Sequence, residues 1–297
     1  METKSLIEVF FPVLVIMAMF GLGLSLTAND FKRVANHPKA VTIALVNQLV
    51  FLPLTALLLV SIFTLKPELA VGFIIVASVP GGILSNVLTL LLKGDAALSV
   101  TLTALSSMIS IVTIPFWVSL ALEQFMNSTG SIHVPAADLV LPVAVLTLIP
   151  LILGLLIRAR WPAFADSAKP AIKIGSGVFI FIGFVVFLID QGENLVAYLV
   201  QAGMGAAVLC MTITLLGYGM AHLFKLRRSI KGTIAIESGI QNIPLAMTIA
   251  ITILGDNPLF AVVPATYGLI MVVLMAVLMV GVIARWPSFQ FSDSETK

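Results

Sequence analysis

Charged residues are scarce in this sequence, and their scarcity excludes most classes of soluble protein. Asp, Glu, Lys and Arg together make up only 10% of the 297 residues, whereas a soluble domain normally carries about 25%. The formal net charge is +2, and the charges lie at the ends of apolar runs instead of forming a concentrated basic patch. Nucleic acid is therefore not an expected partner, because binding it requires such a patch.

Cysteine and histidine are rare as well. The single cysteine, Cys210, lies within an apolar run, which excludes a disulfide framework and a cysteine-based metal site. Of the three histidines, His37 and His133 lie in predicted loops and His222 lies near the end of a predicted membrane span. None has the spacing of a metal ligand or a serine partner to activate. The sequence therefore gives little support to an enzyme.

Apolar residues are abundant: they make up 60% of the chain, and the mean hydropathy is +1.14. A helix that crosses a bilayer needs about 20 mostly apolar residues. We therefore predict an all-α polytopic membrane protein, a single transmembrane domain over residues 1–297 whose first span is retained. The predicted spans are nine, namely residues 7–26, 40–61, 68–92, 96–122, 138–158, 170–190, 194–223, 230–254 and 258–285.

Basic residues are distributed unequally between the two sides of this arrangement. All but two of the 16 Lys and Arg residues follow odd-numbered spans, and the exceptions are Lys4 and Lys66. The positive-inside rule makes the side that holds most of them cytoplasmic. We therefore expect a multi-pass protein of the cell inner membrane with its N-terminus outside and its C-terminus in the cytoplasm.

Two of the predicted spans are interrupted by polar and helix-breaking residues. Among the 14 acidic residues, Glu237 alone lies deep inside a span, the eighth, and Gly239, two amides and Pro244 follow it. The third span is interrupted in its middle at Pro80-Gly81-Gly82. Proline removes a backbone donor and clashes with the preceding turn, and charge at membrane depth is costly and usually functional. We therefore predict two discontinuous helices, one of which carries a buried carboxylate.

Interrupted spans in corresponding halves of a chain are typical of transporter binding sites. The third and eighth spans are five apart, so they run in opposite directions, as an inverted repeat requires. Freed carbonyls can bind a cation, and helix N-terminal amides can bind an anion. The alternative is that proline and glycine merely kink two helices, since both are common in membrane spans. The polar residues beside both breaks favour a binding site.

Two further spans carry polar side chains at membrane depth. In the fourth span the hydroxyls of Ser99, Thr103, Ser106 and Ser110 share one helical face. We expect Ser106 and Ser110 to pack against neighbouring helices, whereas Ser99 and Thr103 are also candidates for binding an ion. The second span carries Asn47 and Gln48, and a glutamine in a membrane is more often an interhelical contact than a ligand.

Taken together, the motifs of these spans resemble the bile acid:sodium symporter family. They are Pro80-Gly81-Gly82-x-x-Ser85-Asn86, Gly94-Asp95-x-x-Leu98-Ser99-x-x-x-Thr103 and Glu237-Ser238-Gly239-Ile240-Gln241-Asn242. The resemblance implies core and panel domains, with the third and eighth spans crossing at their breaks. It also implies two inverted repeats, residues 7–123, which lack the first helix of the repeat, and residues 138–285.

The resemblance further implies two Na⁺ sites that share Glu237. The first site would comprise Ser85, Asn86, Ser99, Thr103 and Glu237. The second would comprise the side chains of Gln48, Glu237 and Gln241 with the backbone carbonyls of Ser238 and Ile240. These ligands agree with the preference of a hard cation for oxygen. The implied substrate contacts are Gly81, Gly82, Ile83 and Asn242.

We therefore predict a secondary symporter that imports a small organic anion with two Na⁺ ions by alternating access. A carboxylate or sulfonate is expected, with bile-acid-like molecules among the candidates and no obligatory protein partner. Compared with some relatives, Ile83 replaces a small hydroxyl residue, Ile243-Pro244 replace small residues, and the apolar segment 270–278 replaces polar side chains that face the substrate. These positions would line the substrate cavity, which leaves the substrate open. An arsenite permease of the same superfamily is less expected, because it would use a cysteine near the broken helices, whereas Cys210 lies in the seventh span. The alternatives from other classes are an intramembrane enzyme and a passive channel or sensor that uses Glu237 without sodium coupling.

Overall fold

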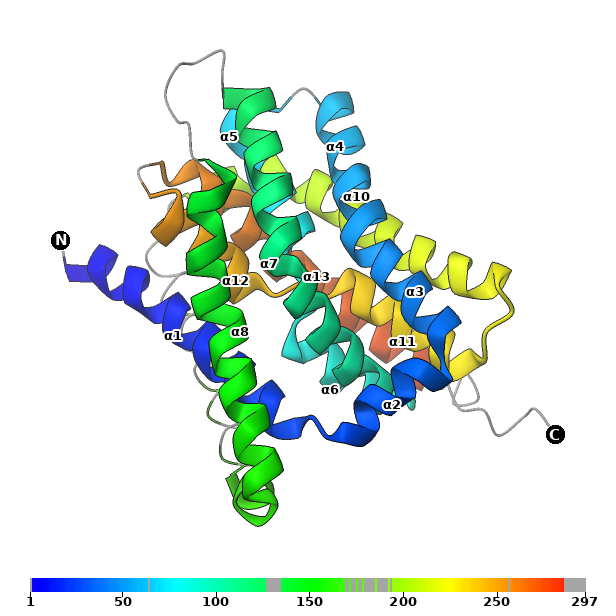
Figure 1. The fold of residues 1–297 in the computed structure, drawn as a ribbon. Coiled ribbons are helices and arrows are strands. Elements are labelled where there is room, and N and C mark those ends of the chain that lie inside the picture. The colour runs from blue at the N-terminus through cyan, green and yellow to red at the C-terminus, as the bar shows by residue number, and fades with distance from the viewer. Residues whose placement is uncertain are drawn as a thin grey trace.

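The computed structural model describes residues 2–63, 65–126, 135–168, 194–255 and 257–285, and between them the single positions Ala171, Gly175, Val178, Val185 and Gly192. Throughout these residues the regular structure is helical (Figure 1). Six stretches are long and apolar enough to cross a membrane. The predicted all-α polytopic membrane class is therefore confirmed. The predicted span 170–190 lies almost wholly outside the described residues, so the count of nine spans stays a prediction.

The six long stretches coincide with predicted spans to within a few residues. One of them is interrupted by a π-helical turn, Asn47–Phe51, between α3 (Pro38–Val46) and α4 (Leu52–Phe63). The short helix α2 (Ala28–Asn36) precedes it. The other five are α1 (Glu2–Ser25), α7 (Ala96–Met126), α8 (Ala136–Arg160), α10 (Leu195–Leu223) and α13 (Leu259–Arg285).

The third and eighth predicted spans are each divided into two short helices. The third consists of α5 (Pro67–Ser78) and α6 (Ile83–Leu91), and the eighth consists of α11 (Arg228–Gly239) and α12 (Ile243–Thr248), which continues through a π-helical turn, Ile249–Ile253. The expected role of Pro244 needs correction. It lies in the first turn of α12, where a missing N–H costs nothing, and the chain leaves the helix earlier, at Ile240.

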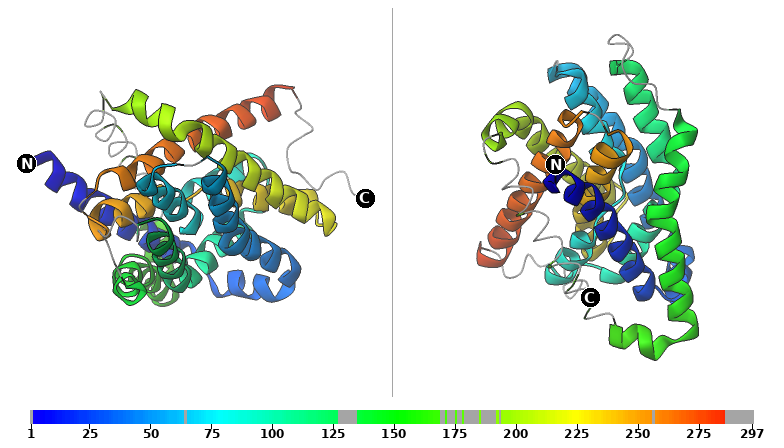
Figure 2. Two further views of the ribbon diagram at one scale, coloured as in Figure 1. Left: turned by 90° about the horizontal axis from the view of Figure 1, so that it is seen from above. Right: turned by 90° about the vertical axis from the view of Figure 1, so that its left-hand side faces the viewer.

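Helices α1 and α8 pack against each other through glycine (Figure 2). A Cβ added to Gly23 would lie 3.1 Å from the Cα of Gly154, and a Cβ added to Gly154 would lie 3.0 Å from the Cα of Gly23. Small residues allow membrane helices to approach this closely, where van der Waals contact and not the hydrophobic effect drives association.

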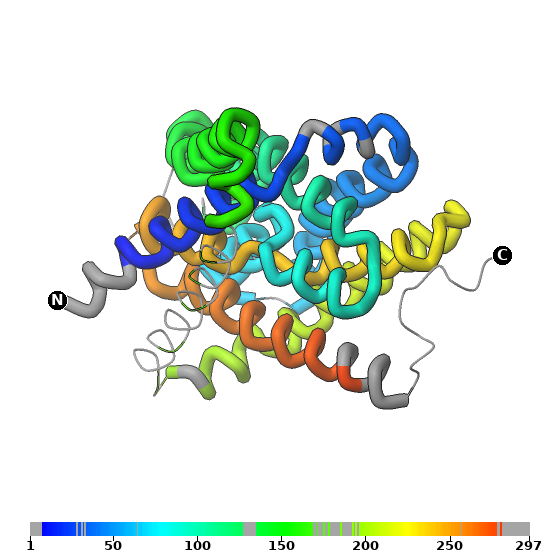
Figure 3. Tube along the Cα trace, turned by 90° about the horizontal axis from the view of Figure 1, so that it is seen from below, coloured from blue at the N-terminus to red at the C-terminus, as the bar shows by residue number. Residues whose placement is uncertain are grey.

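The apolar interior lies between α5, α7, α10 and α13. Phe73, Phe260 and Tyr267 are its largest fully buried side chains. Figure 3 shows α13, in orange to red, running past the short helix α12, with which it packs. On the outer faces, large apolar side chains such as Leu58 and Val200 are exposed. In a membrane protein such faces contact lipid.

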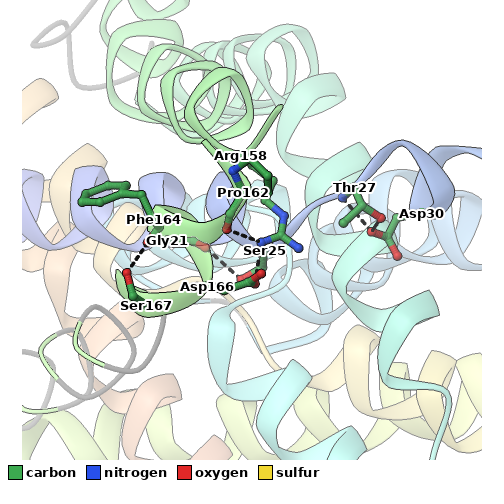
Figure 4. Close-up of polar contacts among 9 residues, drawn as sticks. All are labelled: Gly21, Ser25, Thr27, Asp30, Arg158, Pro162, Phe164, Asp166 and Ser167. Carbon is green, nitrogen blue, oxygen red and sulfur yellow. Dashed lines mark hydrogen bonds and ion pairs between the residues drawn. The ribbon is translucent and has the colours of Figure 1, made fainter. Parts of the chain in front are cut away.

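Polar contacts gather where α8 ends and where α2 begins (Figure 4). After Trp161 the chain turns back, and Arg158 forms an ion pair of 2.5 Å with Asp166. At the start of α2 the backbone N–H and the hydroxyl of Thr27 both donate to Asp30, at 2.7 and 2.6 Å. This side-chain cap satisfies an orphan donor of the helix. Both ends lie on the side that the basic residues predict to be cytoplasmic.

Candidate ion-binding site

The two breaks lie against each other inside the molecule. The Gly82 N–H donates to the Ile240 carbonyl at 3.3 Å, and the Asn242 N–H donates to the Pro80 carbonyl at 3.0 Å. Gly81 and Gln241 form an antiparallel bridge between them. Non-helical backbone inside a membrane needs hydrogen-bond partners from the protein. The first linker, residues 79–82, and the second linker, residues 240–242, therefore supply partners for each other. The sequence indicated the two breaks, and only the family resemblance implied that they meet.

Glycine at positions 81 and 82 permits this approach. A Cβ at Gly81 would overlap the carboxylate of Glu237, and a Cβ at Gly82 would lie 3.0 Å from the carbonyl oxygen of Gln241. Both glycines were predicted as substrate contacts. That role stays a prediction. In the structure Gly81 lies against the Glu237 carboxylate, and Gly82 lies against the second linker.

Glu237 is buried, with 4% of its surface exposed. The Thr103 hydroxyl donates to its Oε1 at 2.5 Å, and the Ser99 hydroxyl donates to its Oε2 at 2.8 Å. Both hydroxyls come from α7, one turn apart. Among the described residues no lysine or arginine forms an ion pair with Glu237. The carboxylate is therefore held by hydroxyl groups and not by a basic side chain.

Asn86 brings a further oxygen to this cluster from α6. Its Oδ1 lies 2.8 Å from the Ser99 hydroxyl and 3.4 Å from the Thr103 hydroxyl. The hydroxyls of Ser99 and Thr103 have one hydrogen each. These two hydrogens are shared among three acceptor oxygens, namely Asn86 Oδ1 and the two carboxylate oxygens of Glu237. The Thr103 hydrogen has a further acceptor in the Ser99 carbonyl, at 3.0 Å. The cluster thus contains more oxygen lone pairs than hydrogens, and a cation is the natural partner for the excess.

Ser85, the fifth residue of the first predicted set, lies at the start of α6. Its hydroxyl donates to the Gly82 carbonyl at 2.7 Å, and its side chain is fully buried. Its side chain also lies within hydrogen-bond reach of the Glu237 carboxylate. All five residues of the first predicted set therefore lie together, and Ser85 in addition fixes the turn by which the chain enters α6.

The second predicted set forms a chain of amides. Gln48 Nε2 donates to Gln241 Oε1 at 2.7 Å and to the Val79 carbonyl at 3.0 Å. Gln241 Nε2 donates to the Ser238 carbonyl at 2.6 Å. Gln48 Oε1 is buried without a hydrogen-bond partner. The structure therefore joins Gln48, Gln241 and Ser238 directly, and the paired linkers connect them to Glu237.

Asn47 belongs to the same cluster, although the sequence reasoning named only Gln48 as a ligand. Asn47 Nδ2 donates to the Ser238 hydroxyl at 2.6 Å, and Asn47 Oδ1 is buried without a partner. The π-helical turn begins at Asn47, and such turns are frequent at functional sites. The sequence feature that could have indicated this role of Asn47 is its position next to Gln48, which places two amides side by side at membrane depth.

The remaining predicted substrate contacts lie at the two helix starts after the breaks. Asn242 Oδ1 accepts from the Leu245 N–H at 3.2 Å and so caps α12. Ile83 begins α6 and is partly exposed. In the segment 270–278, Met271 and Met275 are buried, at 5% and 6% exposure. These two methionines face the second linker, and a role of the segment in lining the substrate cavity stays a prediction.

Paired discontinuous helices around buried oxygen ligands define a membrane transporter, because irregular backbone at membrane depth is tolerated where it builds a site. Residues 12–198 match the Sodium Bile acid symporter family. The chain belongs to this family, as the motifs predicted. It is therefore a transporter and not an enzyme, which removes the intramembrane enzyme from the alternatives.

Three relatives show the extent of the similarity. The chain is 32% identical over 252 residues to the sodium-dependent transporter YocS of Bacillus subtilis (strain 168), covering 83% of this chain and 74% of YocS. It is 32% identical over 249 residues to sodium/bile acid cotransporter 4 of Rattus norvegicus, covering 82% of this chain and 56% of that protein. It is 29% identical over 253 residues to the hepatic sodium/bile acid cotransporter of Rattus norvegicus, covering 83% and 68%.

Proposed function

We propose that this protein is a secondary symporter that couples the entry of Na⁺ to the import of a small organic anion. The observation that carries the proposal is the excess of oxygen lone pairs over hydrogens around the buried Glu237 carboxylate. A lone carboxylate in hydrocarbon costs about 2.5–3.5 kcal/mol even on the mildest scale. The absence of a basic partner among the described residues makes a bound cation the natural source of compensation.

The first Na⁺ would be held by Ser85, Asn86, Ser99, Thr103 and Glu237. All these side chains present oxygen, the ligand that hard cations prefer. The Ser99 and Thr103 hydroxyls can turn their hydrogens away from an ion and toward neighbouring carbonyls. This freedom allows the same atoms to serve with and without the ion.

The second Na⁺ would take oxygens from Gln48, Gln241 and Glu237 and the carbonyls of Ser238 and Ile240. The unpartnered Gln48 Oε1 supports this set. Gln48 Nε2 now covers Gln241 Oε1, so an ion that used this oxygen would displace the amide hydrogen. Filling this site therefore requires a rearrangement of side chains that the first site does not.

The architecture that we propose around these sites has nine spans and two inverted repeats, residues 7–123 and 138–285. The antiparallel pairing of the linkers supports spans that cross at their breaks and a core that moves against a panel. The distribution of basic residues supports an inner-membrane protein with its N-terminus outside. Alternating access would then expose the paired linkers to each side in turn.

The anion would bind near the N-terminal end of α6, where the positive end of the helix dipole favours negative charge, and beside Asn242 at the start of α12, where the first backbone N–H groups already have acceptors. Asn242 lies at this position in α12, and its Oδ1 is already engaged with the Leu245 N–H, which leaves its NH₂ group to donate to a ligand. Two of the relatives carry bile acid in their names. A carboxylate or sulfonate is therefore the class to test first.

A thermal-shift screen tests this function. The purified protein would be heated in NaCl and in KCl of equal concentration, with a panel of carboxylates and sulfonates that includes a bile acid. We expect Na⁺, but not K⁺, to raise the melting temperature, and the transported anion to add to it in NaCl alone. Equal melting temperatures in the two salts contradict the proposal. Uptake of that anion against its gradient in proteoliposomes then separates a symporter from a passive channel or sensor.

A further inference from the structure

The linker between α11 and α12 is held from behind by two side chains of α13. The Tyr267 hydroxyl donates to the Gly239 carbonyl at 3.0 Å. The Gln241 N–H donates to the Met271 sulfur at 3.3 Å. Tyr267 and Met271 are four residues apart in sequence and therefore share one face of α13. That face lies on the side of the linker away from the α5–α6 linker.

These two contacts fix consecutive peptide planes. A trans peptide is planar, and its C=O and N–H point in opposite directions. When Met271 holds the Gln241 N–H, the Ile240 carbonyl of the same peptide must point away from α13. It does so: the Ile240 carbonyl accepts from the Gly82 N–H of the other linker. In the preceding peptide the Gly239 carbonyl is directed to Tyr267, so it is kept away from the proposed ion site.

The surroundings of Gly239 prevent the linker from moving toward α13. The Cys210 thiol of α10 also reaches the Gly239 carbonyl, at 3.6 Å. A Cβ at Gly239 would overlap the Thr214 hydroxyl and lie 2.8 Å from Met275 Cε. The chain is therefore packed on this side as closely as glycine permits.

A packing role alone does not account for Tyr267. Its side chain is fully buried, and a buried hydroxyl without a partner is costly. Phenylalanine would fill nearly the same space without this cost, so the hydroxyl is explained by its contact with the Gly239 carbonyl.

We propose that Tyr267 and Met271 are positioning residues for the second Na⁺ site. Met271 orients the peptide that carries the Ile240 carbonyl, and Tyr267 orients the peptide that lies between it and the peptide of the Ser238 carbonyl. The inference deepens the proposed function and rests on it. Neither residue touches the ion in this scheme. Met271 holds the N–H of the peptide whose carbonyl would contact the ion, and Tyr267 holds the peptide next to it.

The test measures how the melting temperature of the full-length protein depends on NaCl concentration, at constant ionic strength with choline chloride. Tyr267→Phe removes the hydroxyl with little change in volume, and Met271→Leu removes the sulfur acceptor while conserving volume. We expect each to raise the Na⁺ concentration for half-maximal stabilisation by about 2- to 10-fold, since one hydrogen bond is worth 0.5–1.5 kcal/mol. The matched controls, Tyr218→Phe and Met211→Leu on α10, should leave it unchanged.

The outcomes separate this inference from the function beneath it. If Gln241→Ala shifts the Na⁺ dependence but Tyr267→Phe and Met271→Leu behave as their controls do, the positioning role is wrong and the second site stands. A uniform loss of melting temperature at every Na⁺ concentration would show that the two side chains serve packing alone and would also overturn the inference. If Na⁺ does not stabilise even the unaltered protein, the proposed function itself fails.

Discussion

Gly81 and Glu237 lie so close together that a side chain at position 81 would occupy the space of the carboxylate. These residues come from opposite halves of the chain, one in the linker before α6 and the other near the end of α11. Their contact couples the two breaks to the buried charge. A change in how the linkers pair must therefore move the Glu237 carboxylate, and a change at the carboxylate must act on the linkers.

Gly81→Ala should abolish stabilisation by Na⁺. The added Cβ would overlap Glu237 Oε1, so the carboxylate would have to leave the Ser99 and Thr103 hydroxyls. The melting temperature in NaCl and in KCl checks this, and the two values should become equal. Gly219→Ala is the matched control, because a Cβ at Gly219 meets nothing within 4 Å. A normal response to Na⁺ in Gly81→Ala would disprove the coupling.

Glu237→Gln should remove the response to Na⁺ while the protein still folds. Glutamine keeps the shape of the side chain and can accept the Thr103 hydrogen, but it lacks the charge that a cation needs. At a Na⁺ concentration about 100 times the dissociation constant, the lost stabilisation amounts to about 2.7 kcal/mol. Thermal unfolding in NaCl and KCl measures it, and Glu123→Gln at the exposed end of α7 is the control. Sodium-dependent transport that survives Glu237→Gln would contradict the site assignment.

Thr103→Val should weaken Na⁺ binding by about 10-fold or more, because hydrogen bonds to a charged group are worth about 1.5–3 kcal/mol and valine retains only the shape. The readout is the Na⁺ concentration for half-maximal stabilisation. Thr101→Val is a close control on the same helix, since Thr101 is equally buried but donates to the Ala97 carbonyl of its own turn. Equal effects of the two substitutions would show that Thr103 is structural.

Transport of a monoanion should be electrogenic. If two Na⁺ ions accompany one monoanion, each cycle carries one net positive charge inward and gains about 2.3 kcal/mol per 100 mV of inside-negative potential. Uptake into proteoliposomes should then rise with a clamped potential, with a Na⁺ Hill coefficient above one. A coefficient near one and no response to potential would leave one ion per cycle, and the Gln48–Gln241 amides would be structural.

The sequence by itself determined the membrane class, most span boundaries, both breaks and the family. A helix that crosses hydrocarbon satisfies its own backbone hydrogen bonds and needs about 20 mostly apolar residues, so apolar runs of sufficient length can be counted directly. The break in the third span could be predicted because proline and glycine, here Pro80, Gly81 and Gly82, disfavour a continuous helix. The polar residues beside the breaks could be identified as candidate ligands because a carboxylate at membrane depth is energetically costly and usually functional.

Only the tertiary structure decided which of these groups meet. Pairing between linkers from opposite halves depends on how distant helices pack, which no local pattern encodes. The same holds for Asn47 beside Ser238, and for Tyr267 and Met271 behind the second linker. In the sequence Tyr267 and Met271 are part of an apolar span. No local pattern indicates that the hydroxyl and the sulfur bind backbone groups of the linker between α11 and α12. Local physics places a break in the chain, whereas the partners of its freed N–H and C=O groups are set by the packing of the whole fold.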